Sequence, residues 1–443
     1  MRPETFYAKA GDVSVAYQNF GSGPDLVICP GWVSNVEYGW EIPERAAFHD
    51  ELARFVRVTI FDKRGTGLSD REVGAATLEE RIDDLRAVMD ASGIARAHVF
   101  AVSEGGSLSL LFAATYPERV RSLTLFGCFA CRTRQHDYPW APTPEERQTF
   151  YDAIAHRWHA DMDIATIAPS MAGDPAARRR LATYFRMSAS PRGALALARL
   201  NTEIDVRHVL PAIRVPTLVL HREHDADARV EEGRYVADHI PGARLVVLPG
   251  ADHLPYAGDT GPVVDEVRAF VTGVRERAQA DRILATLLFT DIVGSTAQAA
   301  KLGDRAWRAR LERHYAAVDR HVRTYRGQRV KFMGDGALAV FDGPGRALRC
   351  ARALVADPGA PEIALRAGVH TGEVERMGED VGGIAVHVAA RVAAEAEGGE
   401  VLATNTVREL CAGSGLAFED RGLRTLPSFS EPWRLFAVSP RPA

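Results

Sequence analysis

The sequence predicts two α/β-type domains in one chain of 443 residues: a mostly parallel β-sheet wrapped by helices, and then a smaller α+β domain. Three observations predict this arrangement. Short apolar runs alternate with helix-length amphipathic stretches over the first two thirds of the chain, as in a parallel sheet with crossover helices. A strand, a helix and a hairpin follow one another in the last third. The polar stretch RERAQADR at residues 275–282 separates the two regions.

Six apolar runs in the first region have the length of buried strands. They are Leu26–Cys29, Val56–Phe61, His98–Val102, Ser122–Phe126, Thr217–His221 and Leu245–Leu248. Between the fourth and fifth runs lies an insertion rich in Ala, Arg and aromatic residues, which predicts a helical cap over about residues 130–212. The aromatic residues of this cap either line an apolar pocket or form the cap's own core. They include Trp140, Tyr151, Trp158 and Tyr184.

A serine follows the third run in a pattern typical of a catalytic nucleophile. Ser103 lies in the sequence AVSEG, and a helix begins almost at once. A strand, a small-x-Ser-x-Gly turn and a helix form a nucleophile elbow, which exposes a serine hydroxyl above the strand ends. Asp225 and His253 each follow a later strand, which gives the order Ser, Asp, His of a catalytic triad. The turn alone is a weak signal and a single histidine is more often structural, so the order and the strand placement carry this prediction.

Together these features resemble the α/β-hydrolase family. The resemblance extends to FDKRGTGLSD at residues 61–70 and to the sequence PGW at residues 30–32. It implies an α/β-hydrolase fold with a helical cap, in which the backbone N–H groups of Trp32 and Glu104 form the oxyanion hole. Ala101 departs from the glycine that usually opens the elbow motif. Such folds also serve as receptors, so the domain is expected either to sense a small apolar or ester ligand or to hydrolyse one.

Two aspartates in the last third have contexts that suit metal and phosphate binding. Asp291, in LLFTDIVGST, follows the buried run Leu287–Thr290, and the Ser and Thr hydroxyls are expected to cap a helix from Ala297 onward. A phosphate fits the free N–H groups of a helix start, and a metal ion could bridge it to the carboxylate. Asp335, in VKFMGDGALAVF, lies in a tight turn between two strand-like runs. Taken singly, the first aspartate could equally be a helix cap and the second a turn former, with no role in metal binding.

Four motifs in this region occur in the order and approximate spacing of class III adenylyl and guanylyl cyclases. They are FTDIVGST, KFMGDG, LRAGVHTGEV and IAVHVAARV. The resemblance implies an α+β, ferredoxin-like catalytic domain in which Asp291, Asp335 and Ile292 hold two Mg²⁺ or Mn²⁺ ions. One ion would activate the ribose 3′-hydroxyl, and the other would neutralise the triphosphate as pyrophosphate leaves. It also implies that Ile292, Val293 and Gly294 contact the substrate.

Lys331 and Asp380 match the base-selecting pair of this family. Adenine offers an acceptor at N1 and a donor at its 6-amino group, so it pairs with an ammonium and a carboxylate. Guanine has the reverse polarity and would leave buried groups unpaired, which favours ATP over GTP as the substrate. Arg366 matches a triphosphate-contacting arginine, and Arg391 matches the arginine that stabilises charge in the transition state.

His387 departs from the commoner family pattern. It precedes Arg391 by four residues and therefore shares its helical face. It stands where many members have an asparagine that orients the ribose. A histidine can still donate a hydrogen bond, and a bacterial subclass carries one there, so the resemblance puts the rate and pH profile in doubt more than the activity. Alternatively, His387 packs against the sheet.

As a whole, the chain resembles hydrolase–cyclase fusion proteins of actinobacteria. The expected boundaries are a hydrolase-like domain at residues 1–275, a linker at 276–283 and a cyclase domain at 284–443. Cyclases of this class build each active site from two chains, so the resemblance implies a homodimer through the cyclase domain. A short joint can transmit strain, whereas a long flexible linker would uncouple the domains, so the first domain is expected to regulate the second.

Composition argues against several other functions. The chain is 46% hydrophobic and 25% charged with a net charge of -4, and its start, MRPETFYAKAG, has no signal-like apolar stretch, so a cytoplasmic enzyme without a membrane span is expected. Arg305–Lys331 is basic, but its apolar residues recur at helical spacing, which predicts an amphipathic helix and no nucleic-acid site. Five cysteines fit no disulfide framework, and Cys128 and Cys131 are interpreted as pocket-wall residues.

Overall fold

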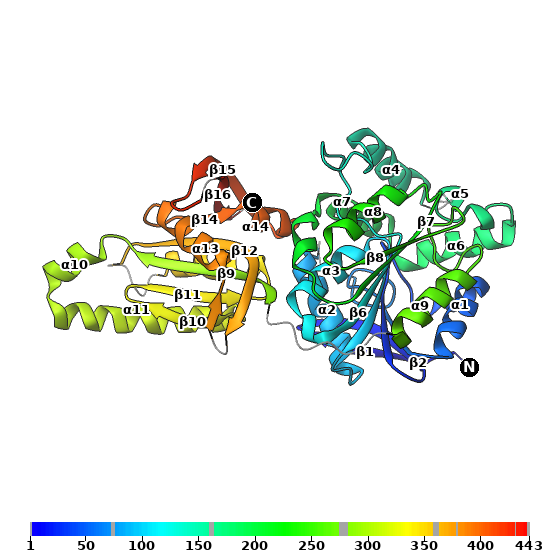
Figure 1. Cartoon of the computed structure of the whole chain (residues 1–443), viewed down its shortest axis with the longest axis horizontal. Helices are drawn as coiled ribbons and strands as arrows, with labels where there is room; N and C mark the ends of the chain where they lie inside the picture. The colour runs from blue at the N-terminus through cyan, green and yellow to red at the C-terminus, as the bar shows by residue number, and fades with distance from the viewer. Residues whose placement is uncertain are drawn as a thin grey trace. The chain divides into compact units, whose positions relative to one another are not determined.

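The structure is a computed structural model that describes residues 2–71, 76–158, 164–273, 282–357, 363–377, 380–429 and 431–440. The chain divides into two compact units, residues 1–280 and 281–443 (Figure 1). The predicted linker at residues 276–283 lies outside the described residues, except for its last two residues, which begin strand β9 (Arg282–Ile292). No helix in the described part of the chain is long and apolar enough to cross a bilayer.

The first unit contains an eight-stranded sheet in the order β1-β2-β4-β3-β5-β6-β7-β8. All six predicted runs form strands: β3 (Asp25–Cys29), β4 (Arg57–Phe61), β5 (Ala97–Val102), β6 (Val120–Phe126), β7 (Thr217–Arg222) and β8 (Arg244–Leu248). These six strands pair in parallel. An antiparallel hairpin of β1 (Thr5–Ala10) and β2 (Val13–Gly21) extends the sheet at one edge, and the sequence did not predict it.

Helices connect these strands and build the cap. The connecting helices are α1 (Pro43–Ala53), α2 (Leu78–Ala91), α3 (Gly105–Thr115) and α8 (Val230–His239), and α9 (Gly261–Gly273) follows the last strand, β8. The cap helices are α4 (Pro144–Arg157), α5 (Ile164–Ile167), α6 (Pro175–Ser188) and α7 (Pro191–Glu203), as the composition of the insertion predicted. Three of them begin with proline directly after a capping side chain, namely Thr143, Asp174 or Ser190. Proline fits the first helical position and the cap accepts a free N–H, so the sequence fixes these helix starts.

The second unit has a mixed sheet in the order β10-β11-β9-β12-β14-β16-β15, with β13 paired to β12. Its strands after β9 are β10 (Gln328–Met333), β11 (Gly336–Phe341), β12 (Leu365–Met377), β13 (Asp380–Gly382), β14 (Val401–Thr404), β15 (Leu416–Thr425) and β16 (Pro432–Pro440). Its helices are α10 (Ser295–Leu302), α11 (Asp304–Thr324), α12 (Pro344–Val355), α13 (Ile384–Glu395) and α14 (Asn405–Leu410). The predicted α+β fold and the hairpin around Asp335 are confirmed.

Two local predictions in this unit are wrong. Strand β9 continues through Asp291, so this aspartate lies in the strand and not after it. Helix α10 begins at Ser295, and its N-cap is Gly294 with φ +64° and no side-chain cap. The predicted hydroxyl caps are absent because the chain turns through a left-handed conformation, which glycine adopts at little cost. The predicted amphipathic helix is confirmed as α11, which buries Val318 and Val322.

Candidate active sites

The nucleophile elbow depends on small residues around Ser103. Ser103 lies between β5 and α3 with φ +53°, a conformation that is strained for a residue with a side chain. A Cβ on Gly105 would come within 2.6 Å of the backbone oxygens of Cys29 and Pro30, and one on Gly106 within 2.7 Å of Cys128. The two glycines therefore let α3 start directly behind the serine. The methyl group of Ala101, where the motif departs from glycine, is fully buried.

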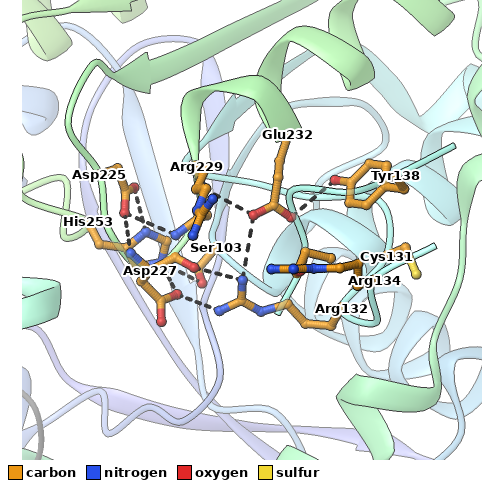
Figure 2. A network of polar contacts seen from close by, with 12 residues as sticks. Ser103, Cys131, Arg132, Arg134, Tyr138, Asp225, Asp227, Arg229, Glu232 and His253 are labelled. Atoms are coloured by element: carbon orange, nitrogen blue, oxygen red, sulfur yellow. Dashed lines mark hydrogen bonds and ion pairs between the residues drawn. The ribbon is translucent and has the colours of Figure 1, made fainter. Parts of the chain in front are cut away.

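The structure brings the three predicted triad residues together (Figure 2). His253 Nε2 lies 2.7 Å from Ser103 Oγ, and His253 Nδ1 lies 2.7 Å from Asp225 Oδ2. The other carboxylate oxygen of Asp225 accepts the backbone N–H groups of Asp227 and Ala228 at 3.0 and 3.1 Å. These contacts hold the Asp225 carboxylate against the imidazole, the arrangement in which a serine can pass its proton to a histidine.

A second carboxylate, which the sequence reasoning missed, lies at the other nitrogen of the histidine. Asp227 Oδ2 is 3.4 Å from His253 Nε2 and 2.9 Å from a guanidinium nitrogen of Arg132. Figure 2 shows Asp227 between these two cations. Burial by itself lowers the pKa of His253, but the Asp225 and Asp227 carboxylates outweigh it and raise the pKa to about 9. The only signal in the sequence is the spacing of the two aspartates in HDAD.

A pocket opens beside Ser103, and its apolar wall consists largely of aromatic rings. The rings that line it are those of Trp32, Phe129, Phe150 and Phe185. None of the four cap aromatics named from the sequence lines this pocket. Trp158, for example, is buried and packs against the rings of Trp32 and Phe185. The named cap aromatics therefore support the pocket from behind or pack elsewhere.

The interpretation of two cysteines as pocket-wall residues is wrong. Both thiols, of Cys128 and Cys131, are buried and neither lines the pocket, whereas Phe129 and Arg132 from the same segment do. Beyond the end of β6 this segment forms no regular strand, and it presents its ring and its guanidinium to the pocket while both thiols stay buried.

The predicted oxyanion-hole residues both line the pocket. Among the described residues, neither the Trp32 N–H nor the Glu104 N–H has a protein acceptor. The Glu104 carboxylate points into the protein, where it accepts hydrogen bonds from Lys63 and Arg81, each at 2.6 Å. These buried ion pairs fix the residue that follows the serine. The two N–H groups are thus available to a substrate oxygen.

In the second unit, the two predicted metal-binding aspartates lie at neighbouring strand ends. The pairing of β11 with β9 sets Ala337 opposite Thr290, so the turn that holds Asp335 lies beside the end of β9 that carries Asp291. Gly336 makes this approach possible, because a Cβ there would come within 2.8 Å of the Thr290 backbone oxygen. The structure therefore places the two aspartates beside each other, at the same end of these neighbouring strands.

Arg366 contacts Asp291 across paired strands. In the register of β12 with β9 the two residues are opposite each other, and the guanidinium donates twice to Asp291 Oδ2, at 2.5 and 2.9 Å. Val293, predicted to contact the substrate, donates its N–H to Ala364 O at 2.9 Å, and its C=O accepts from Gln298 at 2.8 Å. The backbone N–H and C=O of Val293 are thus both engaged within the protein, and a contact of Val293 with the substrate stays a prediction.

The predicted base-selecting residues form a pair. Lys331 Nζ lies 2.7 and 2.9 Å from the two carboxylate oxygens of Asp380, although the residues come from different strands, β10 and β13. The hydrogen bond from Lys331 lowers the pKa of the Asp380 carboxyl. Both side chains are partly exposed. An ammonium and a carboxylate are thus presented together at the surface.

His387 and Arg391 lie on the exposed face of α13. The opposite face of α13, with Val388 and Val392, is buried, so the alternative that His387 packs against the sheet is wrong. Among the described residues, neither side chain makes a hydrogen bond or ion pair with the aspartates or with Lys331. The structure therefore presents the two residues side by side on one helix without joining them to the other candidates.

Comparison with known proteins agrees with both halves of the chain. A family model described as "alpha/beta hydrolase fold" matches residues 24–260, and one described as "Adenylate and Guanylate cyclase catalytic domain" matches residues 278–432. The pimeloyl-[acyl-carrier protein] methyl ester esterase of Neisseria meningitidis serogroup C is 31% identical over 196 residues, 40% of this chain and 70% of that protein. The same enzyme from Nitrosomonas europaea is 26% identical over 250 residues, 55% of this chain and 94% of that protein.

Solved structures show the same fold for the first unit. A thermophilic esterase from Thermogutta terrifontis aligns with a TM-score of 0.52 at 24% identity, covering 62% of this chain and all of that one. An esterase from Exiguobacterium antarcticum aligns with a TM-score of 0.54 at 20% identity, covering 61% and 100%. The family match to the first unit spans more than half of the chain. The protein therefore belongs to the α/β-hydrolase family, and its hydrolase domain is followed by an adenylate and guanylate cyclase catalytic domain.

Proposed function

We propose that the cyclase domain converts ATP to 3′,5′-cyclic AMP and pyrophosphate. The contact between Lys331 and Asp380 carries this proposal. An ammonium beside a carboxylate complements the N1 acceptor and the 6-amino donor of adenine, and it opposes the edge of guanine. Because both side chains are partly exposed, a base can replace the contact between them with contacts of its own.

The two aspartates at the neighbouring ends of β9 and β11 fit a divalent cation. Asp291 uses one carboxylate oxygen for Arg366 and leaves the other, Oδ1, without a partner among the described residues, and Asp335 lies on the adjoining turn. Carboxylate oxygens are the ligands that Mg²⁺ and Mn²⁺ prefer. Asp291, Asp335 and the Ile292 carbonyl would hold the ions. When bound, the ions would supply charge neutralisation for the triphosphate and a lower pKa for the ribose 3′-hydroxyl.

The other candidate residues of the cyclase domain bind and orient the nucleotide. Arg366 is already beside Asp291, where its remaining N–H groups can donate to a phosphate oxygen. Arg391, exposed on α13, stabilises the negative charge that develops during the displacement, and His387 one turn earlier orients the ribose. We further propose that two copies of the chain assemble each site, because His387 and Arg391 contact none of the other candidates within one chain.

The test is a change of base selection. The double variant Lys331→Glu with Asp380→Cys removes the adenine-complementary pair, so cAMP formation from ATP should fall by at least about tenfold more than cGMP formation from GTP. Both products are measured by chromatography at matched nucleotide concentrations. Lys301→Glu, on the exposed α10, is the matched charge control and should leave the ratio unchanged. Equal losses with both nucleotides would remove the role of the pair.

A second activity, ester hydrolysis by the first domain, is favoured by the Ser103–His253–Asp225 distances. Ser103 Oγ would attack the ester carbonyl and pass its proton to His253 Nε2, while the N–H groups of Trp32 and Glu104 bind the oxyanion. The alcohol leaves with that proton, and a water, deprotonated by the same nitrogen, then releases the acid. The alternative is a domain that only binds its ligand and regulates the cyclase.

A fluorophosphonate probe separates these alternatives. It should label Ser103 in the wild-type protein and fail with His253→Ala, because the hydroxyl depends on that base. His239→Ala, an exposed histidine at the end of α8, is the control that should leave labelling intact. Absence of labelling in the wild type would favour the ligand-binding domain, and labelling that survives His253→Ala would contradict the triad.

A further inference from the structure

The pocket beside Ser103 is lined by several charged side chains, and one of them has no counter-ion within ion-pair distance among the described residues. Glu104 is paired with Lys63 and Arg81, Asp227 with Arg132, and His253 with Asp225. Arg147, from cap helix α4, also lines the pocket. In the part of the chain that the structure describes, no carboxylate lies within ion-pair distance of its guanidinium.

The contacts of Arg147 are all to neutral groups. Its Nε donates to Thr202 Oγ1 at 2.9 Å and its Nη2 donates to Ala198 O at 3.3 Å. The guanidinium lies over the rings of Phe150 and Tyr151, at 4.8 and 5.3 Å from their centroids. These contacts use two of its three nitrogens. Among the residues that the structure describes, the third nitrogen, Nη1, donates no hydrogen bond within 3.5 Å.

Burial makes this unpaired charge costly. Arg147 is only 8% exposed. Burial lowers the pKa of its guanidinium and the nearby Arg132 lowers it further, against smaller opposing effects of Tyr151 and of the Asp227 carboxylate, which itself pairs with Arg132. A buried charge that has left water is normally compensated by an opposite charge. The site is therefore prepared for an anion that the protein itself does not provide.

We propose that the pocket takes an acyl ligand with a free carboxylate, and that Arg147 binds this carboxylate while the acyl carbon faces Ser103. As a substrate, this ligand is the monoester of a dicarboxylic acid, a point that depends on the proposed hydrolase activity. A guanidinium binds a carboxylate through two parallel hydrogen bonds, and aromatic walls accommodate the methylene chain. Asp227 lines the same pocket and repels a carboxylate from the histidine, which fixes the direction of the ligand.

Two 4-nitrophenyl esters of equal chain length test the preference. The monoester of glutaric acid carries the free carboxylate, and the ester of pentanoic acid does not. The kcat/KM for the glutaric monoester should exceed that for the pentanoic ester by at least about tenfold, because a hydrogen bond to a charged group contributes a free energy of that size. Arg147→Met should remove this preference. Arg147→Lys should keep part of it. Arg199→Met, an exposed arginine on α7 that also lies over Tyr151, is the charge-matched control and should leave the ratio unchanged.

Binding to a protein that cannot turn over separates this inference from the hydrolase proposal. With Ser103→Ala, calorimetry should detect hexanoate and should detect hexanamide at least about tenfold more weakly. Adding Arg147→Met should weaken hexanoate binding to the level of hexanamide. This result supports the ligand class even if wild-type protein cleaves neither ester. Equal binding of the two compounds, binding of neither, or hexanoate binding that survives Arg147→Met would overturn the proposal, as would ester cleavage without preference for the acid.

Discussion

His253 has a carboxylate at each ring nitrogen, and these two groups set the pH at which Ser103 can react. An imidazolium cannot accept the serine proton, so the rate depends on the fraction of neutral His253. Asp225 and Asp227 raise the pKa of His253 to about 9, against the opposing effects of burial and of Arg132. We therefore expect the proposed hydrolysis to be slow below this pH and to gain rate as the pH rises through it.

The corresponding prediction concerns the pH profile of ester cleavage. In the wild type, kcat/KM should rise with pH, and the midpoint of this rise should lie near pH 9. Asp227→Asn removes one of the two charges, so the midpoint should fall by about one pH unit. Asp137→Asn, which removes an exposed carboxylate paired with Arg207, should leave the midpoint in place. A midpoint that does not move with Asp227→Asn would show that this carboxylate has no influence on the base.

A second prediction concerns the aspartates of the cyclase domain. Asp291→Asn and Asp335→Asn each remove one charge from the proposed metal site, so cAMP formation should fall by at least about a hundredfold. Asp319→Asn removes a partly exposed carboxylate that pairs with Arg329 and serves as control. Thermal unfolding of each variant must match the wild type, because Asp291 also holds Arg366. Near-normal activity in either aspartate variant would argue against the metal site.

Among individual residues of the first site, the sequence predicts the triad but not the charged residues of the cap around it, and the difference has a physical reason. Ser103, Asp225 and His253 follow strands of one sheet, and strand order brings them together in space. The groups that tune the site, Arg132 and Arg147, come from the loop and helix of the cap. Their position depends on how the cap packs over the sheet, which no local pattern encodes.

Elements were predictable where burial is continuous. The strands β3 to β7 of the first unit are buried over nearly their whole length, because helices cover both faces of a parallel sheet, and the edge strand β8 still carries a continuous apolar run. The β1–β2 hairpin at the edge mixes exposed and buried positions, so its sequence shows no continuous apolar run. Strand β9 extends over eleven residues, although only Leu287–Thr290 was predicted. Tertiary pairing with β12 along its whole length continues a strand whose ends have weaker local signals.

The position of α13 on the sheet depends on one glycine, which gives a third prediction. A Cβ on Gly368 of β12 would come within 2.2 Å of Ala393 N and 2.7 Å of Ala389 O, both on the helix backbone. Gly368→Ala should therefore push α13 away and displace His387 and Arg391, lowering cAMP formation by at least about tenfold and reducing stability by about 1–3 kcal/mol. Both effects are measured on the same preparation, by product formation and by thermal unfolding.

The matched control for this variant is Gly398→Ala. A Cβ there would meet its nearest atom, the Ala364 Cβ, at 3.4 Å, which is ordinary contact. This variant should retain both activity and stability. If Gly368→Ala behaves in the same way, close packing of α13 on β12 does not position the two residues.

At the scale of the whole molecule, the chain combines two units with separate cores. An extensive cluster of buried residues lies within the first unit, and three further clusters lie within the second. Lys331 and Asp335 lie on one hairpin of the second unit, yet Lys331 pairs with Asp380, while Asp291 pairs with Arg366. Within one chain, therefore, the base-selecting pair and the proposed metal site are held by separate contacts.

The last prediction follows from this separation. If a two-fold dimer forms each site from the aspartates of one copy and the base-selecting pair of the other, Asp335→Ala and Lys331→Ala should each be inactive alone and active when mixed. A mixed dimer places both defects in one site and leaves the other intact. Random exchange makes half of the dimers mixed, each with one good site of two, so activity should recover to about a quarter of the wild type. The full-length variants are mixed in equal amounts, and subunit exchange is confirmed with two affinity tags. If exchange occurs and no cAMP forms, each site is built within a single chain, and the pairing of Lys331 with Asp380 must serve the same copy that carries Asp335.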